Sequence, residues 1–158
     1  MDLGIAGKRA LVLASSRGLG LAAARALARE GASVILSGRD QARLASAVRA
    51  IAADDRKADA VAADLTQPKS ISALNAAVEQ KFGGLDILIN NVDGPPAKPI
   101  SSVSIDEWRR EFDAMVGSVL RVTGHFLPWM RARLVGRGAA NRKSRHLQCI
   151  ALLAGSLE

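Results

Sequence analysis

The chain has 158 residues, of which 49% are hydrophobic and 23% are charged, a composition that fits one globular domain and excludes a largely disordered chain. No apolar run approaches the roughly 18 residues that a membrane span requires. The first residues lack the basic, apolar and small-residue order of a signal peptide, and the single Cys149 excludes an internal disulfide framework. We therefore expect a cytoplasmic protein.

The net charge of +7 is unevenly distributed along the chain. Residues 1–130 carry 16 basic against 14 acidic side chains, whereas residues 131–158 carry 6 against 1. A strongly basic protein commonly binds nucleic acid or an anionic membrane. Because the body is nearly neutral and the excess lies in the tail, we expect neither of these partners.

Short apolar runs alternate with amphipathic stretches, and this alternation predicts parallel βαβ units in an α/β fold. Gly31 is expected to end the first helix and Asp40 to cap the second. Pro128 is expected to kink or end the last helix. The expected strands span residues 9–13, 33–37, 58–63 and 85–89, and the expected helices span residues 18–30, 40–53, 70–82 and 106–134.

The last part of the chain has a different character. Residues 131–146 show no clear period, and residues 147–154 fit either one more apolar strand or a helical turn. We expect one domain over residues 1–134 and a divergent basic tail over residues 135–158. A shifted reading frame would produce such a tail. A genuine short tail and an oligomerisation segment are the alternatives.

A small-residue loop joins the first expected strand to the first expected helix. A tight turn at this place lets backbone N–H groups and the helix N-terminus face a pyrophosphate. Small residues allow the phosphates to approach the backbone closely. The alternative is a plain glycine turn before a helix. The position of the loop within a βαβ unit predicts a nucleotide site formed by Ala14, Ser15, Ser16, Arg17, Gly18, Leu19 and Gly20.

This loop resembles the Thr-Gly-x-x-x-Gly-x-Gly loop of the short-chain dehydrogenase/reductase family, with Leu13, Ala14, Gly18 and Gly20 at the four fixed positions. The resemblance covers roughly residues 5–134, the amino-terminal cofactor-binding portion of a family member, so the chain looks truncated. It implies a Rossmann-like doubly wound parallel sheet in the order 3-2-1-4, incomplete on its C-terminal side. It also implies hydride transfer between a nicotinamide cofactor and a carbonyl or alcohol.

Two further motifs carry the resemblance. Asp64 and Leu65 match the family's adenine-contacting acidic position after the third strand. Residues 90–94, Asn-Asn-Val-Asp-Gly, resemble the family's Asn-Asn-Ala-Gly motif, whose first asparagine, here Asn90, braces the central strands near the cofactor. Asp93 departs from that motif and places a negative charge near the nucleotide site.

The residue that follows the second strand indicates which cofactor is used. NAD-binding proteins place an acid there for the ribose hydroxyls, whereas NADP-binding proteins place an arginine near the 2′-phosphate. In this chain Arg39 follows the strand and Arg17 lies in the loop, so two guanidinium groups can clamp a 2′-phosphate. We expect NADP(H) to be favoured over NAD(H). The alternative is that Arg39 is only a surface residue.

The catalytic half of the family pattern is missing. The family uses a Tyr-x-x-x-Lys pair and a serine on the fifth strand, but these 158 residues contain no tyrosine. The family's helix asparagine aligns with Met115, and Ser156 comes too late to replace the serine. His125 is interpreted as a packing residue, and together with His146 and Cys149 it forms no metal-ligand spacing. We expect no catalytic residue, no metal and no activity as written.

Three functions remain open. The first is the cofactor-binding part of an NAD(P)H-dependent oxidoreductase that does not turn over by itself. The second is a non-catalytic NADP(H)-binding or subunit-interaction module. Its long helix over residues 106–134 corresponds to one that the family uses for packing into homo- or hetero-oligomers. The third is a degenerate or frameshifted gene product, in which one side of the fourth strand stays unpaired. The substrate is not predicted.

Overall fold

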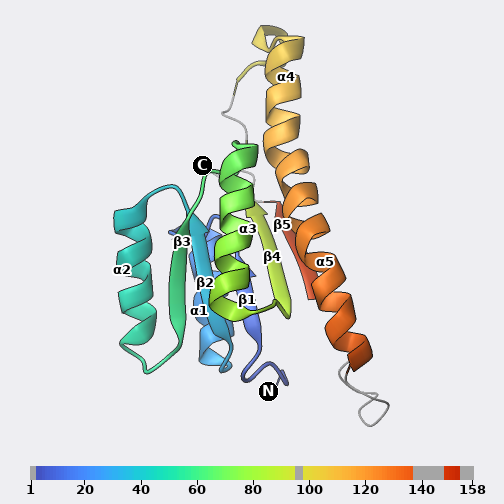
Figure 1. Cartoon of the computed structure of the whole chain (residues 1–158). Coiled ribbons are helices and arrows are strands. Elements are labelled where there is room, and N and C mark those ends of the chain that lie inside the picture. The colour runs from blue at the N-terminus through green and yellow to red at the C-terminus, as the bar shows by residue number, and fades with distance from the viewer. Residues whose placement is uncertain (1–2, 95–97, 137–147, 154–158) are drawn as a thin grey trace.

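The computed structural model describes residues 3–94, 98–136 and 148–153. Five parallel strands form one sheet in the order β3-β2-β1-β4-β5 (Figure 1). The strands are β1 (Arg9–Val12), β2 (Ser33–Gly38), β3 (Ala58–Ala62), β4 (Ile87–Val92) and β5 (Gln148–Leu153). The helices are α1 (Gly18–Arg29), α2 (Gln41–Ala52), α3 (Pro68–Phe82), the 3-10 turn η1 (Ile100–Ser102), α4 (Ile105–Phe112), the π-helical segment η2 (Asp113–Gly117) and α5 (Ser118–Gly136).

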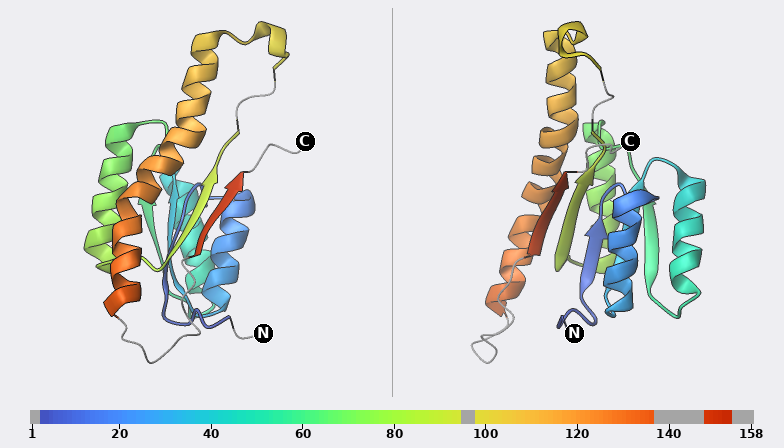
Figure 2. Two further views of the ribbon diagram at one scale, coloured as in Figure 1. Left: turned by 90° about the vertical axis from the view of Figure 1, so that its right-hand side faces the viewer. Right: turned by 180° about the vertical axis from the view of Figure 1, so that it is seen from behind.

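The two faces of the sheet bury alternate residues of the central strands, as the period of a strand requires. Val12 and Ile89 pack toward α1 and α2, whereas Leu11 and Leu88 pack toward α3 and α5. Figure 2 shows these two helical layers on opposite sides of the sheet. The expected α/β class and doubly wound arrangement are therefore confirmed, and the expected order 3-2-1-4 is present within the sheet.

The sheet extends beyond the four expected strands. β5 pairs in parallel with β4 over six residue pairs, from Ile87 opposite Gln148 to Val92 opposite Leu153. The expectation of an unpaired side on β4 is therefore wrong, and the strand interpretation of residues 147–154 is the correct one. Pairing removes a row of free backbone groups from the edge of β4. The division of the chain at residue 134 stays a prediction, although α5 runs across it.

β4 begins and ends later than its apolar pattern predicted. It continues through Asn90 and Asn91 to Val92 instead of ending at Ile89. Both asparagines are buried, with exposed fractions of 2% and 5%. A polar pair is tolerated there because each side-chain amide donates a hydrogen bond within the protein.

The long carboxyl-terminal helix is interrupted earlier than Pro128 predicted. The five residues of η2 separate α4 from α5, whereas α5 continues through Pro128 to Gly136. α4 extends past the end of the sheet, and α5 packs beside α3 (Figure 1). Within the described ranges, no helix is both long and apolar enough to cross a membrane.

Phe126 tests whether α5 is docked on the sheet. It is fully buried in the cluster that joins α3, α5 and the sheet. We expect Phe126→Ala to lower the free energy of unfolding by about 3–5 kcal/mol, because it removes a buried ring and leaves a cavity. Denaturant unfolding followed by circular dichroism measures this change. Arg131→Ala, at an exposed residue of the same helix, is the control and should change stability by less than about 0.5 kcal/mol. Equal effects would contradict the docking.

Candidate cofactor site

The loop between β1 and α1 makes a sharp change of direction at two residues. Ala14 has φ +45° and Gly18 has φ +58°, both in the left-handed region. Glycine adopts this conformation without a steric penalty, whereas alanine does so at a cost. Ala14 occupies the position of the first glycine in the family loop. The left-handed conformation is therefore kept at this position although the glycine that favours it is replaced.

Gly20 is the residue that the loop geometry requires. A Cβ atom at this position would lie 2.5 Å from the Ala14 carbonyl oxygen and 2.7 Å from the Asn91 Nδ2 atom. Neither neighbour can move freely, because the first belongs to the backbone and the second is hydrogen-bonded. The first turn of α1 therefore packs directly on the loop only because residue 20 has no side chain.

Ser15 fixes the loop to β2. Its backbone N–H donates to the Ser37 carbonyl oxygen at 2.7 Å, and its hydroxyl donates to the Val12 carbonyl oxygen at 2.7 Å. The same hydroxyl accepts a hydrogen bond from the Ser37 backbone N–H at 3.0 Å. The Ser15 side chain is fully buried and points into the protein, so it positions the loop and does not face the cleft described below.

The two adjacent asparagines of β4 serve opposite faces of the sheet. Asn90 Nδ2 donates to Thr123 Oγ1 of α5 at 3.0 Å. Asn91 Nδ2 donates to the Ala14 carbonyl oxygen at 3.1 Å and to that of Leu13 at 3.3 Å. The residue that holds the loop is therefore Asn91, which the sequence reasoning did not select. The alternation of side chains along a strand was the signal that could have identified it.

A cleft of about 340 Å³ lies at the carboxyl ends of β1, β2, β3 and β4. Ligands of open parallel sheets bind at this edge, and the volume is within the range of about 300–1,000 Å³ found for small-molecule pockets. Six predicted cofactor residues line the cleft: Ala14, Ser16, Arg17, Arg39, Asp64 and Leu65. The other five, Ser15, Gly18, Leu19, Gly20 and Asn90, are not among its lining residues.

Ion pairs occupy most of the basic groups in this cleft. Arg43 Nε lies 3.1 Å from Asp40 Oδ2, and Arg39 Nη2 lies 3.3 Å from Asp93 Oδ2. Asp40 also caps α2, as expected, by accepting a hydrogen bond from the Arg43 backbone N–H. Within the described ranges, Arg17 has no ion-pair partner. It is the one cleft arginine without a carboxylate beside it.

Asp64 closes the turn that leads from β3 into α3. Its Oδ1 atom accepts hydrogen bonds from the Thr66 backbone N–H at 2.9 Å and from the Thr66 hydroxyl at 2.8 Å. The backbone N–H bond is the main cause that lowers the pKa of Asp64, and the hydroxyl and the charge of Arg39 lower it further against the effect of burial. Asp64 is therefore a carboxylate at neutral pH, and its negative charge is attracted to the positive charge of Arg39.

The remaining candidate residues lie away from this cleft or outside the described residues. His125 is exposed and not packed in the core, and its Nε2 atom lies 2.7 Å from Glu79 Oε1, a surface contact that joins α5 to α3. Met115 lies within the π-helical segment. His146 and Ser156 fall outside the described residues, and Cys149 lies in β5. The described ranges contain no group of three or more potential metal ligands.

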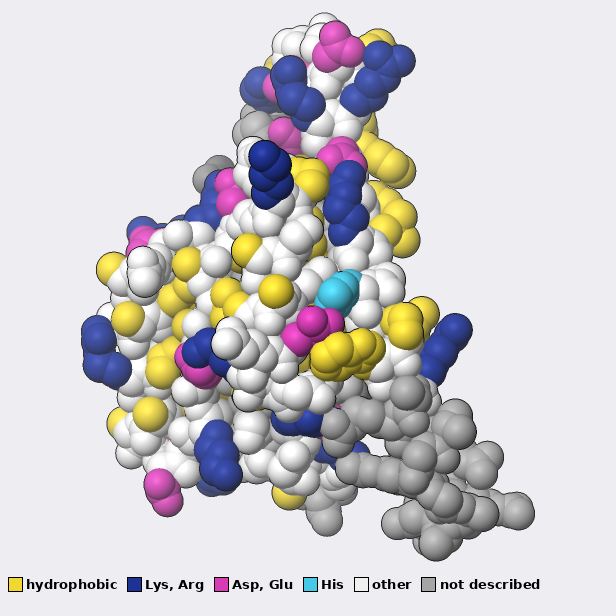
Figure 3. All heavy atoms as spheres, in the orientation of Figure 1, with side chains coloured by type: hydrophobic (Ala, Val, Ile, Leu, Met, Phe, Trp, Pro, Cys, Tyr) yellow, Lys and Arg dark blue, Asp and Glu magenta, His cyan; other side chains and the backbone are white. Residues whose placement is uncertain are grey.

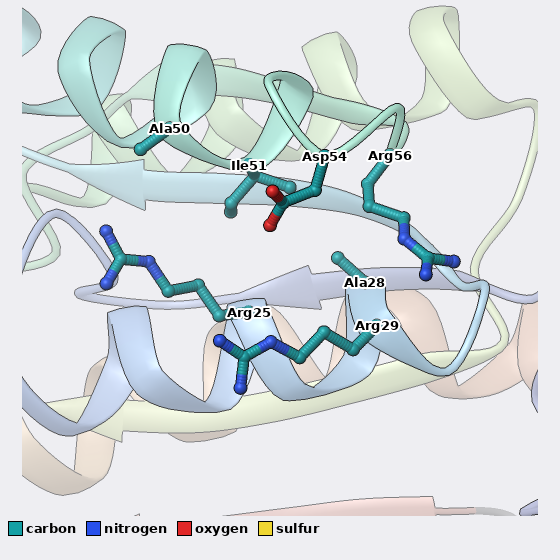
Figure 4. Close-up of a pocket in the computed structure, with 7 residues that line it drawn as sticks. All are labelled: Arg25, Ala28, Arg29, Ala50, Ile51, Asp54 and Arg56. Carbon is teal, nitrogen blue, oxygen red and sulfur yellow. The ribbon is translucent and has the colours of Figure 1, made fainter.

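A second hollow of about 220 Å³ lies between the carboxyl-terminal ends of α1 and α2 (Figure 4). Arg25, Arg29 and Arg56 line it together with Asp54. In Figure 4 the three guanidinium groups spread apart and do not converge on one point. Helix carboxyl termini carry partial negative charge, which the nearby arginines offset. We assign these arginines to the helix ends and not to a ligand.

Gly20 and Gly124 form a matched pair for testing the close approach in the loop. Gly20→Ala should lower the free energy of unfolding by about 1–3 kcal/mol, because the new methyl group overlaps the backbone of Ala14. Gly124→Ala should raise it by about 0.5–1 kcal/mol, because a methyl group there meets no atom within 4 Å in a helix. Denaturant unfolding distinguishes the two. Equal stability of both variants would show that the loop has room for a side chain.

Comparison with known proteins agrees with this geometry. The sequence model of the family described as short chain dehydrogenase matches residues 8–138. The chain is 35% identical over 137 residues to the uncharacterized oxidoreductase YvrD of Bacillus subtilis, covering 87% of this chain and 51% of that protein.

Solved structures show the same correspondence. L-sorbose reductase from Gluconobacter frateurii, complexed with NADPH and L-sorbose, superposes with a TM-score of 0.80 at 35% identity, covering 84% of this chain and 51% of that one. A short chain dehydrogenase from Burkholderia cenocepacia in complex with NADP gives a TM-score of 0.74 at 32% identity, covering 80% of this chain and 52% of that one. The chain therefore belongs to the short-chain dehydrogenase family and spans about half the length of the relatives it matches.

Proposed function

We propose that this chain is the NADP(H)-binding portion of a short-chain oxidoreductase and does not catalyse hydride transfer by itself. The observation that carries this proposal is the cleft at the carboxyl ends of β1–β4, where the loop after β1 meets Arg39 and Asp64. The neighbours complexed with NADPH and NADP support this choice of cofactor. A cytoplasmic location remains part of the same proposal.

The N-terminus of α1 fits the pyrophosphate of a dinucleotide. Its N-cap residue, Arg17, makes no capping hydrogen bond with its side chain, and its first turn contains no acidic residue. The side chains of Asp40 and Ser104 cap α2 and α4, whereas α3, which begins at Pro68 away from the loop after β1, also lacks a side-chain cap. The backbone N–H groups that begin α1 therefore lack a side-chain acceptor, which suits a phosphate. Gly20 lets the first turn of α1 pack against Ala14 and Asn91, which sets the position of this N-terminus.

The charges and shapes along the cleft support the following proposed roles for individual residues. Arg17 and Arg39 would hold the 2′-phosphate, and Leu65 beside Asp64 would contact the adenine. Because Arg17 has no carboxylate partner in the described part of the chain, its charge is available to a phosphate. Asn91 and Ser15 would act indirectly, by fixing the loop that presents its backbone N–H groups.

NADP(H), when bound, supplies or accepts a hydride at its nicotinamide ring. The 158 residues contain no tyrosine to move the accompanying proton, and Met115 has no group that could relay one. We propose that turnover requires residues other than these, as a longer protein of the family would contain. The role of this chain is then to bind and orient the cofactor.

Cofactor binding provides the direct test. We expect NADPH to bind about tenfold more tightly than NADH, because only NADPH carries the 2′-phosphate with which Arg17 and Arg39 would form additional ionic hydrogen bonds. Arg39→Ala should narrow this preference to about threefold or less, as measured by isothermal titration calorimetry. Arg49→Ala, an exposed arginine of α2 that does not line the cleft, is the control and should leave the preference intact.

The same preparation should show no NADPH-dependent reduction of carbonyl compounds. Robust turnover would contradict the claim that the chain only binds. An unchanged preference in Arg39→Ala would remove Arg39 from the site.

A second function, subunit interaction, is favoured by one specific observation. Apolar side chains form an exposed stripe along α4, η2 and the start of α5, visible at the edge of the upper helix in Figure 3. Their spacing of three or four residues places them on one side of the helix. The stripe consists of Ile105, Trp108, Phe112, Val116 and Leu120, with exposed fractions between 37% and 66%. Exposed contiguous apolar patches mark interaction sites.

Association through this stripe can be measured by sedimentation of the chain alone and mixed with a full-length relative. We expect a homo- or hetero-oligomer, which the double substitution Trp108→Ser with Phe112→Ser dissociates. Leu3→Ser, at an equally exposed leucine outside the stripe, is the control and should leave the association unchanged. A chain that sediments as a monomer both alone and in the mixture with the full-length relative would contradict this function.

A further inference from the structure

Asp93 and Arg39 form an ion pair that spans the carboxyl end of β1. Arg39 follows β2 directly, and Asp93 follows β4 directly. In the sheet, β1 lies between these two strands. The Nη2–Oδ2 distance of 3.3 Å therefore closes a bridge between the two neighbours of β1, and both side chains line the same cleft as the loop after β1.

We propose that Asp93 is a specificity-determining residue, which engages Arg39 and thereby weakens binding of dinucleotides that carry a 2′-phosphate. The inference rests on the proposed function and concerns the same site. It assigns to Asp93 a role opposite to that of Arg39. The chain would then discriminate less strongly between NADPH and NADH than its arginines alone would allow.

The distribution of charge in the cleft supports this role. Arg43 is engaged by Asp40, and Arg39 is engaged by Asp93. Arg39 also faces the carboxylate of Asp64, whose pKa is lowered chiefly by the Thr66 backbone N–H and in part by the charge of Arg39. A 2′-phosphate that binds Arg39 therefore competes with one carboxylate for the guanidinium group while it lies near a second. Like charges at such a site raise the free energy of the bound state.

The exposure of the pair sets the size of the effect. The side chains of Arg39 and Asp93 are 66% and 71% exposed. Water and salt screen an ion pair of this kind, so breaking it has a modest cost. The effect on affinity should consequently be several-fold and not several orders of magnitude. It should also decrease as the salt concentration rises.

Asp93→Asn tests the inference, because it removes the charge and retains the shape. We expect the dissociation constant of NADPH to fall by about threefold to tenfold, whereas that of NADH changes by less than about twofold. The nucleotides 2′,5′-ADP and 5′-AMP, which lack nicotinamide, should show the same contrast. Asp106→Asn is the control, since it removes the charge of an exposed carboxylate on α4 that pairs with Arg109 outside the cleft.

A double-mutant cycle shows whether Asp93 acts by pairing with Arg39 or by repelling the 2′-phosphate directly. In the Arg39→Ala background, Asp93→Asn should improve NADPH binding by less than about twofold. A threefold to tenfold gain in the Arg39→Ala background would overturn the inference. An equal gain for NADH, or no gain in NADPH affinity, for Asp93→Asn in the parent chain would also overturn it. In each case, NADPH binding by the parent chain would still uphold the proposed function. If neither the parent chain nor Asp93→Asn bound any of the four nucleotides, the proposed function and the inference would fail together.

Discussion

The close approach of backbone to backbone at Gly20 is the constraint on which the candidate site depends. The first turn of α1 packs directly against the Ala14 carbonyl and the Asn91 amide, where a single methyl group would not fit. The loop can therefore cross the carboxyl ends of the central strands and leave the helix N-terminus open. Ser37 of β2 bonds to Ser15 of the loop and Asn91 of β4 bonds to the Ala14 carbonyl, so β2 and β4 both fix the loop that follows β1.

Ion pairs between arginines and carboxylates that the fold brings together, and not the overall composition, balance the charge in the cleft. The arginines that suit a phosphate come from the ends of β1 and β2 and from α2, and carboxylates face two of the three. Such pairing keeps the exposed edge of the sheet free of an uncompensated positive patch when no anion is bound. If the proposed cofactor site is correct, a phosphate that binds Arg39 competes with the carboxylate that pairs with it. The affinity for a phosphate therefore depends on the carboxylates as much as on the arginines.

The proposed division between cofactor binding and catalysis rests on the residues that these 158 positions contain and lack. It spans about half of its relatives and contains the β1–β4 edge at which a dinucleotide is proposed to bind. The helix that carries Met115 projects beyond the sheet and presents an apolar stripe. A binding edge joined to an exposed apolar helix suits a component that works together with further polypeptide, in the same chain or in another.

The sequence by itself determined the parallel βαβ units and the small-residue loop after the first strand, because these follow from periodicity and from local backbone preferences. The order of the first four strands and the two helical layers came from the resemblance to a known family. Only the tertiary structure decided that Asn91 holds the loop, that Asp93 reaches Arg39, that β5 completes the edge of β4 and that the long helix breaks at η2. The first three of these features join residues up to 78 positions apart. Local sequence patterns do not determine contacts between residues that lie so far apart in the chain. Folding of the sheet brings the strand ends together and thereby decides which of their side chains form pairs.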